Sequence, residues 1–178
     1  MDLRGARCTV RNWRMGDADA LVRHANNIKV AQQLRDRFPY PYTRANAQAF
    51  LRAATGGAAP SNLAIEVEGE AAGGIGYVAG TDVERYSAEI GYWLGEAYWN
   101  RGIATEALIL VTDHLFATTS LLRLFALPFA ANAGSIRVLE KAGYTREALL
   151  RSSSVKDRTP RDQALYARVN TAWRGVAK

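Results

Sequence analysis

The sequence predicts an α/β fold built on one mixed, mostly antiparallel sheet of about seven strands with about four helices. Hydrophobic periodicity gives the order strand, two helices, three strands, helix, strand, helix and two strands. The elements do not alternate throughout and no Gly-x-Gly-x-x-Gly follows the first strand, which excludes a doubly wound dinucleotide-binding fold. With 178 residues, 48% of them hydrophobic, the chain can bury a full core, so we expect a single domain over 1–178.

The first third of the chain is expected to hold one strand and two helices. Residues 8–13 form the strand, and the first helix follows with Asp17 as a candidate cap. The Phe-Pro-Tyr-Pro-Tyr segment at 38–42 cannot be helical, because each proline lacks the backbone N–H and pushes its predecessor into extended geometry. Thr43 then caps the second helix, and residues 55–62, rich in Gly, Ala, Pro and Ser, form a loop.

Three antiparallel strands and a long helix are expected next. Residues 63–67 and 73–78 form a hairpin around a turn at 68–70, and residues 87–94 form the third strand. A helix follows, since apolar residues recur at the spacing of one helical face. They are Ile103, Ala107, Leu110, Val111 and Leu115.

The last third is expected to contain a strand, a helix and a final pair of strands. The apolar run at 121–127 is typical of a strand buried on both faces. Residues 132–141 form a helix that ends before a glycine. Residues 144–150 and 163–169 form the final strands, and the polar stretch 152–162 connects them.

Composition limits the cellular compartments and the kinds of partner that we expect for this chain. No run approaches the roughly 18 apolar residues of a membrane span, and residues 1–7 contain no signal-peptide core, so no membrane association is expected. The single Cys8 excludes an internal disulfide and fits a cytoplasmic protein with a buried, inert thiol. His24 and His114 have no partners at ligand spacing, so we expect no metal.

The net charge of +6 is spread along the chain. Of the 23 basic residues, 19 are arginines, and they are scattered rather than clustered. A nucleic-acid-binding protein typically shows a basic stripe with interleaved aromatic residues. One polyanionic cofactor or an acidic partner accounts for the sign of the charge equally well. We therefore expect no nucleic-acid partner, although the charge keeps that class as a hypothesis to be tested by salt-dependent binding.

The stretch 87–107 carries the chemistry. An apolar strand leads through a short aromatic turn into a helix that begins near Ile103. A helix start leaves backbone N–H groups unpaired at the positive end of the helix dipole, which makes it an anion site. Gly102 and Ala104 are small enough to let a phosphate approach the backbone there.

Two segments resemble one enzyme family. The pattern Trp99-x-x-Gly102-x-Ala104 resembles the coenzyme A pyrophosphate loop of the GNAT-type N-acetyltransferase superfamily. The segment 132–144, Asn-x-x-Ser-x-x-x-Leu-Glu-Lys-x-Gly-Tyr, resembles the branch that contains the ribosomal-protein-alanine N-acetyltransferases. The resemblance implies a GNAT-like fold, with the sheet splayed at its centre and helices on both faces. It implies acetyl-CoA as cofactor, and a homodimer is among the states expected of the branch.

The resemblance also assigns roles in binding acetyl-CoA. The pyrophosphate would lie on the amides of Arg101, Gly102, Ile103, Ala104 and Thr105. The pantetheine arm would pair with the backbone of Trp93 and Leu94, where the central strands separate. Asn132 matches the family asparagine that contacts the cofactor arm, and it also has the side chain of a helix cap.

Two residues are candidates for catalysis. Glu89 stands near the position of the strand glutamate that acts as base in several family members, relaying the proton through water where needed; the alternative is an ion pair with Arg85 or Arg123. The family tyrosine that protonates the leaving thiolate is absent, because Leu139 occupies its position. Ser135 can instead hydrogen-bond the sulfur; the alternative is a bond to its own helix backbone.

We therefore expect an acetyl-CoA-dependent N-acetyltransferase that works through a ternary complex. The acceptor is a primary amine, on a protein N-terminus or on a small molecule, and segment 38–42 is either a wall of its pocket or a packed connector. Ser154 stands where members acting on ribosomal proteins can carry a glutamate, which argues against a ribosomal acceptor. The alternative is a catalytically weak coenzyme A or acyl-CoA-binding module on the same fold.

Overall fold

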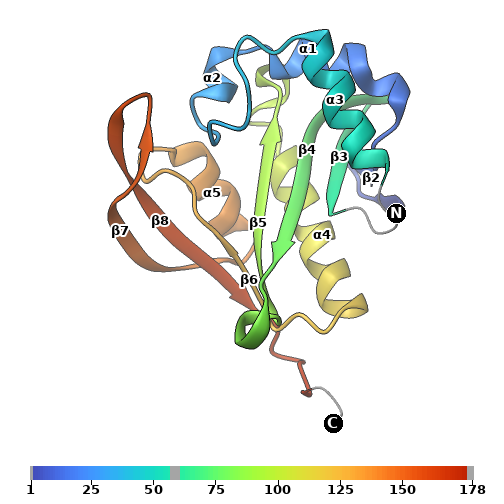
Figure 1. Cartoon of the computed structure of the whole chain (residues 1–178). Helices are drawn as coiled ribbons and strands as arrows, with labels where there is room; N and C mark the ends of the chain where they lie inside the picture. The colour runs from blue at the N-terminus through green and yellow to red at the C-terminus, as the bar shows by residue number, and fades with distance from the viewer. Residues whose placement is uncertain (1, 57–60, 176–178) are drawn as a thin grey trace.

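The computed structural model describes residues 2–56 and 61–175 and shows one sheet with helices on both of its faces (Figure 1). The strands are β1 (Asp2–Arg4), β2 (Thr9–Asn12), β3 (Asn62–Val67), β4 (Glu70–Ala79), β5 (Ser87–Leu94), β6 (Arg123–Ala126), β7 (Thr145–Lys156) and β8 (Thr159–Val169). The helices are α1 (Ala18–Ala25), α2 (Ile28–Ala31), α3 (Arg44–Thr55), α4 (Ile103–Thr118) and α5 (Ala133–Lys141), with 3-10 turns η1 (Met15–Asp17), η2 (Asp82–Glu84) and η3 (Glu96–Tyr98).

The predicted class is confirmed, and two short elements were not expected. The described residues form eight strands in the order β1-β2-β3-β4-β5-β6-β8-β7. The extra strand is β1, which pairs with β2 but is largely exposed and has no apolar alternation to predict it. The extra helix is the single turn α2, which is capped by Asn27 accepting from Lys29 N at 2.8 Å.

The sheet changes character at its centre. The four strand pairs from β1–β2 to β4–β5 are antiparallel. The next pair, β5–β6, is parallel and covers only three residues of each strand, the last pair being Glu89 with Phe125. Beyond this point the strands separate, as the resemblance implied. Arg123 and Phe125 of β6 are only partly buried, so the expectation that this strand is buried on both faces was wrong. Its buried residues, Leu124 and Ala126, share a hydrophobic core with residues of α4 and α5.

Two hydrophobic cores hold the helices on the sheet. The larger core lies on the α4 and α5 face, and its fully buried side chains include Leu108 and Leu124. The smaller core lies on the α1 and α3 face around Trp13 and Leu51. Thr43 caps α3 as predicted, accepting from Asn46 N at 3.2 Å.

Asp17 has a different role from the predicted one. It makes no side-chain cap to α1, and instead its carboxylate takes two hydrogen bonds of 2.8 Å from the guanidinium of Arg11. Arg11 also pairs with Glu66, so this buried ion cluster ties β2 and β3 to the start of α1. The hydrogen bonds that Arg11 donates to Asp17 raise the pKa of Arg11 against the effect of burial.

The C-terminal hairpin is longer than predicted. The polar stretch 152–162 is no connector, because most of it belongs to β7 and β8, which reverse at Asp157 and Arg158 with φ of 50° and 61°. The prediction failed because this half of the hairpin projects from the domain, so it lacks the apolar alternation of a strand lying on a core. Of the loop predicted at 55–62, residues 57–60 lie outside the described residues, and β3 already begins at Asn62.

Candidate active site

The site is organised around the gap between β5 and β6. Beyond Glu89, β5 has no partner strand on its β6 side within the described ranges. Gly95 N donates to Ala72 O at 2.8 Å, and this ladder turns the N–H and C=O groups of Trp93 toward β4. In the neighbouring residues Tyr92 and Leu94, the N–H and C=O groups point in the opposite direction, away from β4 and into the gap. Of the two residues expected to hold a pantetheine arm, Leu94 thus presents its backbone to the gap.

Trp93 contributes its side chain instead. Residues 89, 91 and 93 of β5 face the α1 and α3 side of the sheet, and there the ring of Phe38 packs edge-on against Trp93 at 5.5 Å. Trp99, the first residue of the Trp99-x-x-Gly102-x-Ala104 pattern, donates its indole N–H to Leu94 O at 2.7 Å. This bond fixes the turn between the end of β5 and the start of α4.

The start of α4 has the geometry of an anion site. Gly102 precedes the helix with φ of 75°, a left-handed conformation that favours glycine. The first helical bond runs from Glu106 N to Gly102 O at 3.0 Å, so the helix leaves the amides of Ile103, Ala104 and Thr105 without an intrahelical acceptor. Gly102 has no side chain to cap them. These amides are available to an anion.

A cavity of about 540 Å³ lies beside this helix start. Three cationic side chains line it: Arg7, Arg101 and Lys141. Arg101 lies over the ring of Tyr98, with its guanidinium carbon 5.5 Å from the ring centre. Lys141 has no ion-pair partner among the described residues. The cavity therefore combines free helix amides with positive charge, as a phosphorylated ligand requires.

Glu106 is the anion that this cationic region already contains. Its carboxylate accepts hydrogen bonds from the backbone of Ala6 (3.1 Å), Arg7 (2.7 Å) and Cys8 (3.0 Å). Burial acts to raise the pKa of Glu106, and these hydrogen bonds outweigh it, so that the pKa is lowered. The carboxylate thereby holds the β1–β2 loop against α4. Burial, with the nearby charge of Glu106, raises the pKa of Cys8 to about 12, which fits the predicted inert thiol.

The start of α5 closes the other side of the gap. Asn132 caps the helix, since its Oδ1 accepts from Ser135 N at 3.0 Å, and its amide N–H groups stay available. The Ser135 hydroxyl makes no bond to its own helix backbone. It lies 2.9 Å from the phenol oxygen of Tyr92, on the part of β5 that borders the gap. Asn132 and Ser135 are therefore brought to the same end of α5, against β5.

Glu89 lies where β5 and β6 part, on the opposite face of β5 from Tyr92. It forms an ion pair, but with Arg35 rather than with Arg85 or Arg123. Arg123 pairs with Glu147 at 2.7 Å, and Arg85 donates to Asp82 O at 2.6 Å. Arg35 follows α2 and is exposed, so the Glu89 carboxylate remains open to exchange with another cation.

A loop over Glu89 joins the N-terminal and C-terminal parts of the chain. Asp36, next to Arg35, accepts from Lys156 Nζ of β7 at 2.8 Å, and the Lys156 side chain is only 10% exposed. With Phe38 on Trp93, these contacts hold the segment after α2 between β5 and the C-terminal hairpin. Within segment 38–42, Phe38 packs against Trp93 and Tyr42 is buried in the smaller core, so the segment is packed onto the Glu89 face of β5.

Four residues that the fold brings to this region have no role predicted from the sequence. They are Arg7, Arg35, Tyr92 and Lys141. Tyr92 was recognised only as a strand former. Arg7 and Arg35 belong to a chain with 19 arginines, so neither carries a signal of its own. Lys141 stands at the end of the predicted helix 132–141, so a cation near that end could be predicted. The side of the molecule that its side chain faces depends on how α5 packs.

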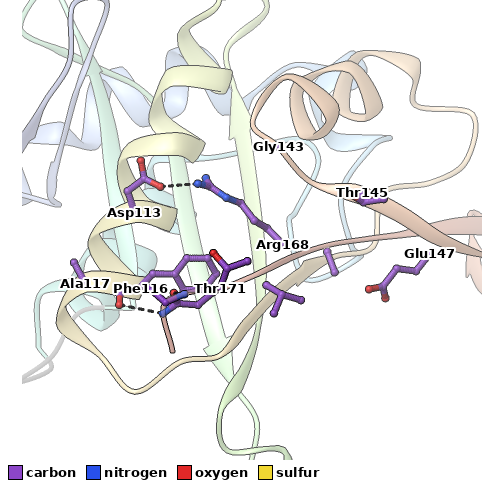
Figure 2. A pocket seen from close by; sticks show the side chains of 12 residues that line it. Asp113, Phe116, Ala117, Gly143, Thr145, Glu147, Arg168 and Thr171 are labelled. Carbon is purple, nitrogen blue, oxygen red and sulfur yellow. Dashed lines mark hydrogen bonds and ion pairs between the residues drawn. The ribbon is translucent and has the colours of Figure 1, made fainter. Parts of the chain in front are cut away.

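A larger cavity of about 740 Å³ shares no residue with this site (Figure 2). It lies between the end of α4 and the β7–β8 hairpin. Its charged side chains are paired, Asp113 with Arg168 of the same cavity at 3.0 Å and Glu147 with Arg123 of β6. Over the described ranges no group of His, Cys, Asp and Glu side chains could hold a metal ion, and no helix is long and apolar enough to cross a bilayer. The gap and the start of α4 remain the candidate site.

Comparisons with known proteins agree on one family. The family model described as acetyltransferase (GNAT) domain matches residues 7–145. A probable N-acetyltransferase of Bacillus subtilis, YjcK, is 45% identical over 67 residues, which cover 38% of this chain and 37% of that relative.

Solved structures share the fold over nearly the whole chain. RimJ of Mycobacterium smegmatis in complex with a coenzyme A disulfide superposes with a TM-score of 0.84 and 26% identity, covering 95% of this chain and 87% of that one. The ribosomal-protein-S5-alanine acetyltransferase of Vibrio fischeri has a TM-score of 0.81 and 19% identity, covering 98% and 100%.

Proposed function

The chain belongs to the family of GNAT acetyltransferases, and from this premise we propose that it transfers the acetyl group of acetyl-CoA to a primary amine by direct attack in a ternary complex. The observation that carries the proposal is the gap between β5 and β6, which opens between the free amides of α4 and the capped start of α5. A thioester with a phosphorylated arm fits such a gap, and a related structure binds a coenzyme A disulfide.

The residues present fit acetyl-CoA at its phosphate end. The amides of Arg101 to Thr105 and the side chains of Arg7, Arg101 and Lys141 offer donors and positive charge. A Cβ on Gly102 would lie 3.3 Å from Arg7 Nε, so any other residue here would require the Arg7 side chain to move slightly away from the helix start. When bound, acetyl-CoA supplies an activated acyl group with a thiolate leaving group. The gap-facing backbone of Tyr92 and Leu94 and the Asn132 amide would hold the arm.

Glu89 is the proposed base for the acceptor amine. An acceptor enters from the face where Arg35 and segment 38–42 lie, and its ammonium group takes the place of the Arg35 guanidinium on the carboxylate. Glu89 then accepts the amine proton directly or through a water. An α-amine, with a pKa of about 7.7–8.0, needs less help than a lysine of about 10.4. The acceptor is a small-molecule amine or a protein N-terminus, in a cytoplasmic enzyme for which a homodimer is one expected state.

Cofactor binding is tested first by thermal unfolding with acetyl-CoA, using NAD as the control ligand. At 100-fold excess over the dissociation constant, acetyl-CoA stabilises the folded state by about 2.7 kcal/mol. For a chain of this size the midpoint rises by roughly 5–10 °C. A rise with acetyl-CoA alone supports the site, and no rise at millimolar ligand contradicts it.

Turnover is then measured on amines and peptide N-termini with the Glu89→Gln variant. We expect kcat/KM to fall by about 10²-fold or more, because the carboxylate no longer accepts the proton. Glu147→Gln is the matched control, since Glu147 is also a strand carboxylate paired with an arginine. An unchanged Glu89→Gln enzyme removes Glu89 from the mechanism.

One observation favours the alternative of a binding module without efficient catalysis. Leu139, at the position of the family acid, is fully buried in the core, so no hydroxyl can act from there. Tight acetyl-CoA binding with no turnover on any amine is the result that selects this alternative.

A further inference from the structure

Four glycines stand in the central strands β4 and β5, and the one in β5 lies under open space. The three in β4 are covered so closely that a Cβ would overlap a neighbouring atom: Gly73, Gly74 and Gly76. A Cβ on Gly91 of β5 would meet no atom of the described residues within 4 Å. Gly91 has no positive φ, and the pairing with β4 passes through it without a register shift. Neither packing nor backbone conformation therefore requires a glycine at 91.

A glycine inside a strand is unfavourable. It loses more conformational freedom on folding than other residues, and it has no side chain to pack. Such a glycine often marks a place where a ligand approaches the backbone closely. Gly91 is exposed, and its missing side chain would point to the Glu89 face of β5, because the two residues are two positions apart in the strand. The glycine thus keeps a space open beside the proposed base.

Along β5, this space lies between Glu89 and Trp93, each about 7 Å from Gly91 at the rise of a strand. Both side chains turn away from it. The carboxylate of Glu89 pairs with Arg35. The indole of Trp93 lies over β4, where its Nε1 would be 2.8 Å from a Cβ on Gly74. Neither residue therefore covers Gly91.

Across the sheet, the space is closed on one side and open on the other. The partner of Gly91 on β4 is Gly76, and Asn62 Oδ1 occupies the place that a Cβ of Gly76 would take. On the β6 side the last strand pair is Glu89 with Phe125, so Gly91 is already beside the gap. The space above Gly91 is thus limited toward β4 and continuous with the gap.

From this geometry we infer that the space above Gly91 receives the carbon that carries the acceptor's amine, and that Gly91 limits the size of the groups on that carbon. The inference rests on the proposed function and deepens it. The attacking nitrogen must reach Glu89, directly or through one water, and it must also reach the acetyl carbon in the gap. Gly91 lies between these two positions, so the nitrogen and its neighbouring carbon lie over it.

A side chain at 91 should act on the acceptor and spare the cofactor. The backbone N–H and C=O of Gly91 face β4, as those of Trp93 do, because residues 91, 93 and 95 alternate with the gap-facing residues. An added side chain leaves the groups of Tyr92 and Leu94 that are proposed to hold the pantetheine arm unchanged. It takes up only the space above the strand.

The test is steady-state kinetics of the full-length enzyme with Gly91→Ala and Gly91→Val. Two acceptors are used: the best amine found for the wild-type enzyme, and its homologue with one methyl group more or fewer on the carbon next to the nitrogen. We expect kcat/KM for the best amine to fall about 10-fold in Gly91→Ala and about 100-fold in Gly91→Val, because the added carbons stand where the acceptor must lie. The loss should be larger for the bulkier of the two amines.

Acetyl-CoA binding and folding serve as internal controls. The dissociation constant of acetyl-CoA should change less than about twofold, since the gap-facing backbone is unaltered. The unfolding midpoint should stay the same or rise, because alanine and valine restrict the unfolded chain more than glycine and suit an exposed strand. A loss of activity in these variants is then not a loss of fold.

Ser87→Thr is the matched control variant. Like Gly91→Ala it adds one methyl group to the same face of β5, two residues from Glu89 in the other direction, where β5 is still paired with β6. It should leave kcat/KM within about twofold of the wild-type value.

Four results overturn the inference. An unchanged kcat/KM in Gly91→Val shows that the acceptor does not pass over Gly91. An equal loss for the two amines removes the size limit. An equal loss of acetyl-CoA affinity assigns the space to the cofactor, and an equal loss in Ser87→Thr reduces the effect to a disturbed Glu89. A wild-type enzyme that binds acetyl-CoA but acetylates no amine contradicts the proposed function instead, and is recognised before any variant is made.

Discussion

At the scale of single residues, Gly102 decides how closely a phosphate can approach α4. Its φ of 75° is a conformation in which a side chain costs roughly 1–2 kcal/mol. A Cβ there would also lie 3.3 Å from Arg7 Nε and 3.5 Å from its Cδ. The backbone conformation therefore favours glycine, and a side chain here would also displace Arg7 slightly.

Gly102→Ala should weaken both acetyl-CoA binding and the stability of the fold. We expect about 1–2 kcal/mol lower stability from the left-handed conformation and at least a tenfold higher dissociation constant. Denaturant unfolding and ligand titration measure the two effects. Gly16→Ala is the control, because its Cβ would meet nothing within 4 Å and its φ is not positive. Unchanged affinity in Gly102→Ala would show that the phosphate does not bind at this helix start.

Residues of the site differ in how far the sequence could reveal them. Gly102, Asn132 and Ser135 lie in local patterns, so the elements that carry them were predicted, and the structure puts them at helix starts. The pairings were not predictable, because they join distant positions. Tyr92 and Ser135 are 43 residues apart, and Arg35 and Glu89 are 54 apart. Only the packing of helices on the sheet brings such pairs together.

At the scale of elements, Glu106 joins α4 to the β1–β2 loop. Three backbone N–H groups converge on one carboxylate, with distances from 2.7 to 3.1 Å. They carry Arg7 to the cavity beside Gly102. From the sequence, a glutamate in the first turn of a helix predicts a favourable interaction with the positive end of that helix. The hydrogen bonds that Glu106 accepts from distant residues depend on the folded structure.

This carboxylate should make stability depend on acid pH. The pKa of Glu106 is lowered in the folded state, so its contribution is fully present above the ordinary pKa of about 4.3 and is lost as the pH falls through the lower, folded value. Glu106→Gln should be less stable at pH 7, by about 1–3 kcal/mol, and lose less stability than wild type below about pH 4.3. Thermal unfolding from pH 7 to pH 3 measures both. Parallel curves for the two proteins would contradict this role.

Element prediction succeeded where one face of the element lies on a core and failed where none does. The helix from Ile103 and the strands β3 to β5 were confirmed, because each buries an apolar face. The far half of the β7–β8 hairpin was wrongly taken as a connector. Its pairs, such as Ser154 with Arg161, are held by backbone bonds between polar residues, and the register shifts between Leu150 and Ser154. A strand of this kind has no alternation of apolar and polar residues, so the sequence pattern does not predict it.

At the scale of the whole molecule, the face proposed for the acceptor is assembled from distant parts of the chain. Asp36 and Lys156 are 120 residues apart and meet at 2.8 Å. Figure 1 shows the tip of the β7–β8 hairpin reaching toward α2, beside the open part of the sheet. The loop after α2 is thus held from one side by β5 and from the other by the hairpin.

Lys156→Met should affect the acceptor and spare the cofactor. Methionine keeps most of the buried stem but loses the ion pair with Asp36, so the loop is held from one side only. We expect the KM for the amine to rise about 3- to 10-fold, while the dissociation constant of acetyl-CoA changes less than twofold. Arg158→Met is the control, since Arg158 lies at the hairpin turn and has no ion-pair partner among the described residues. An equal loss of cofactor affinity would place Lys156 in the acetyl-CoA site instead.

Only three residue pairs join β5 to β6, so at the centre of the sheet the backbone of β5 beyond Glu89 has no neighbouring strand on this side within the described residues. In the proposed complex the pantetheine arm lies along this part of β5 and takes up backbone groups that a neighbouring strand would otherwise satisfy. The cofactor arm would then take the place of a hydrogen-bonded neighbouring strand. In that complex, each release of coenzyme A would remove these hydrogen bonds. The centre of the sheet would then be least stable just before the next acetyl-CoA binds.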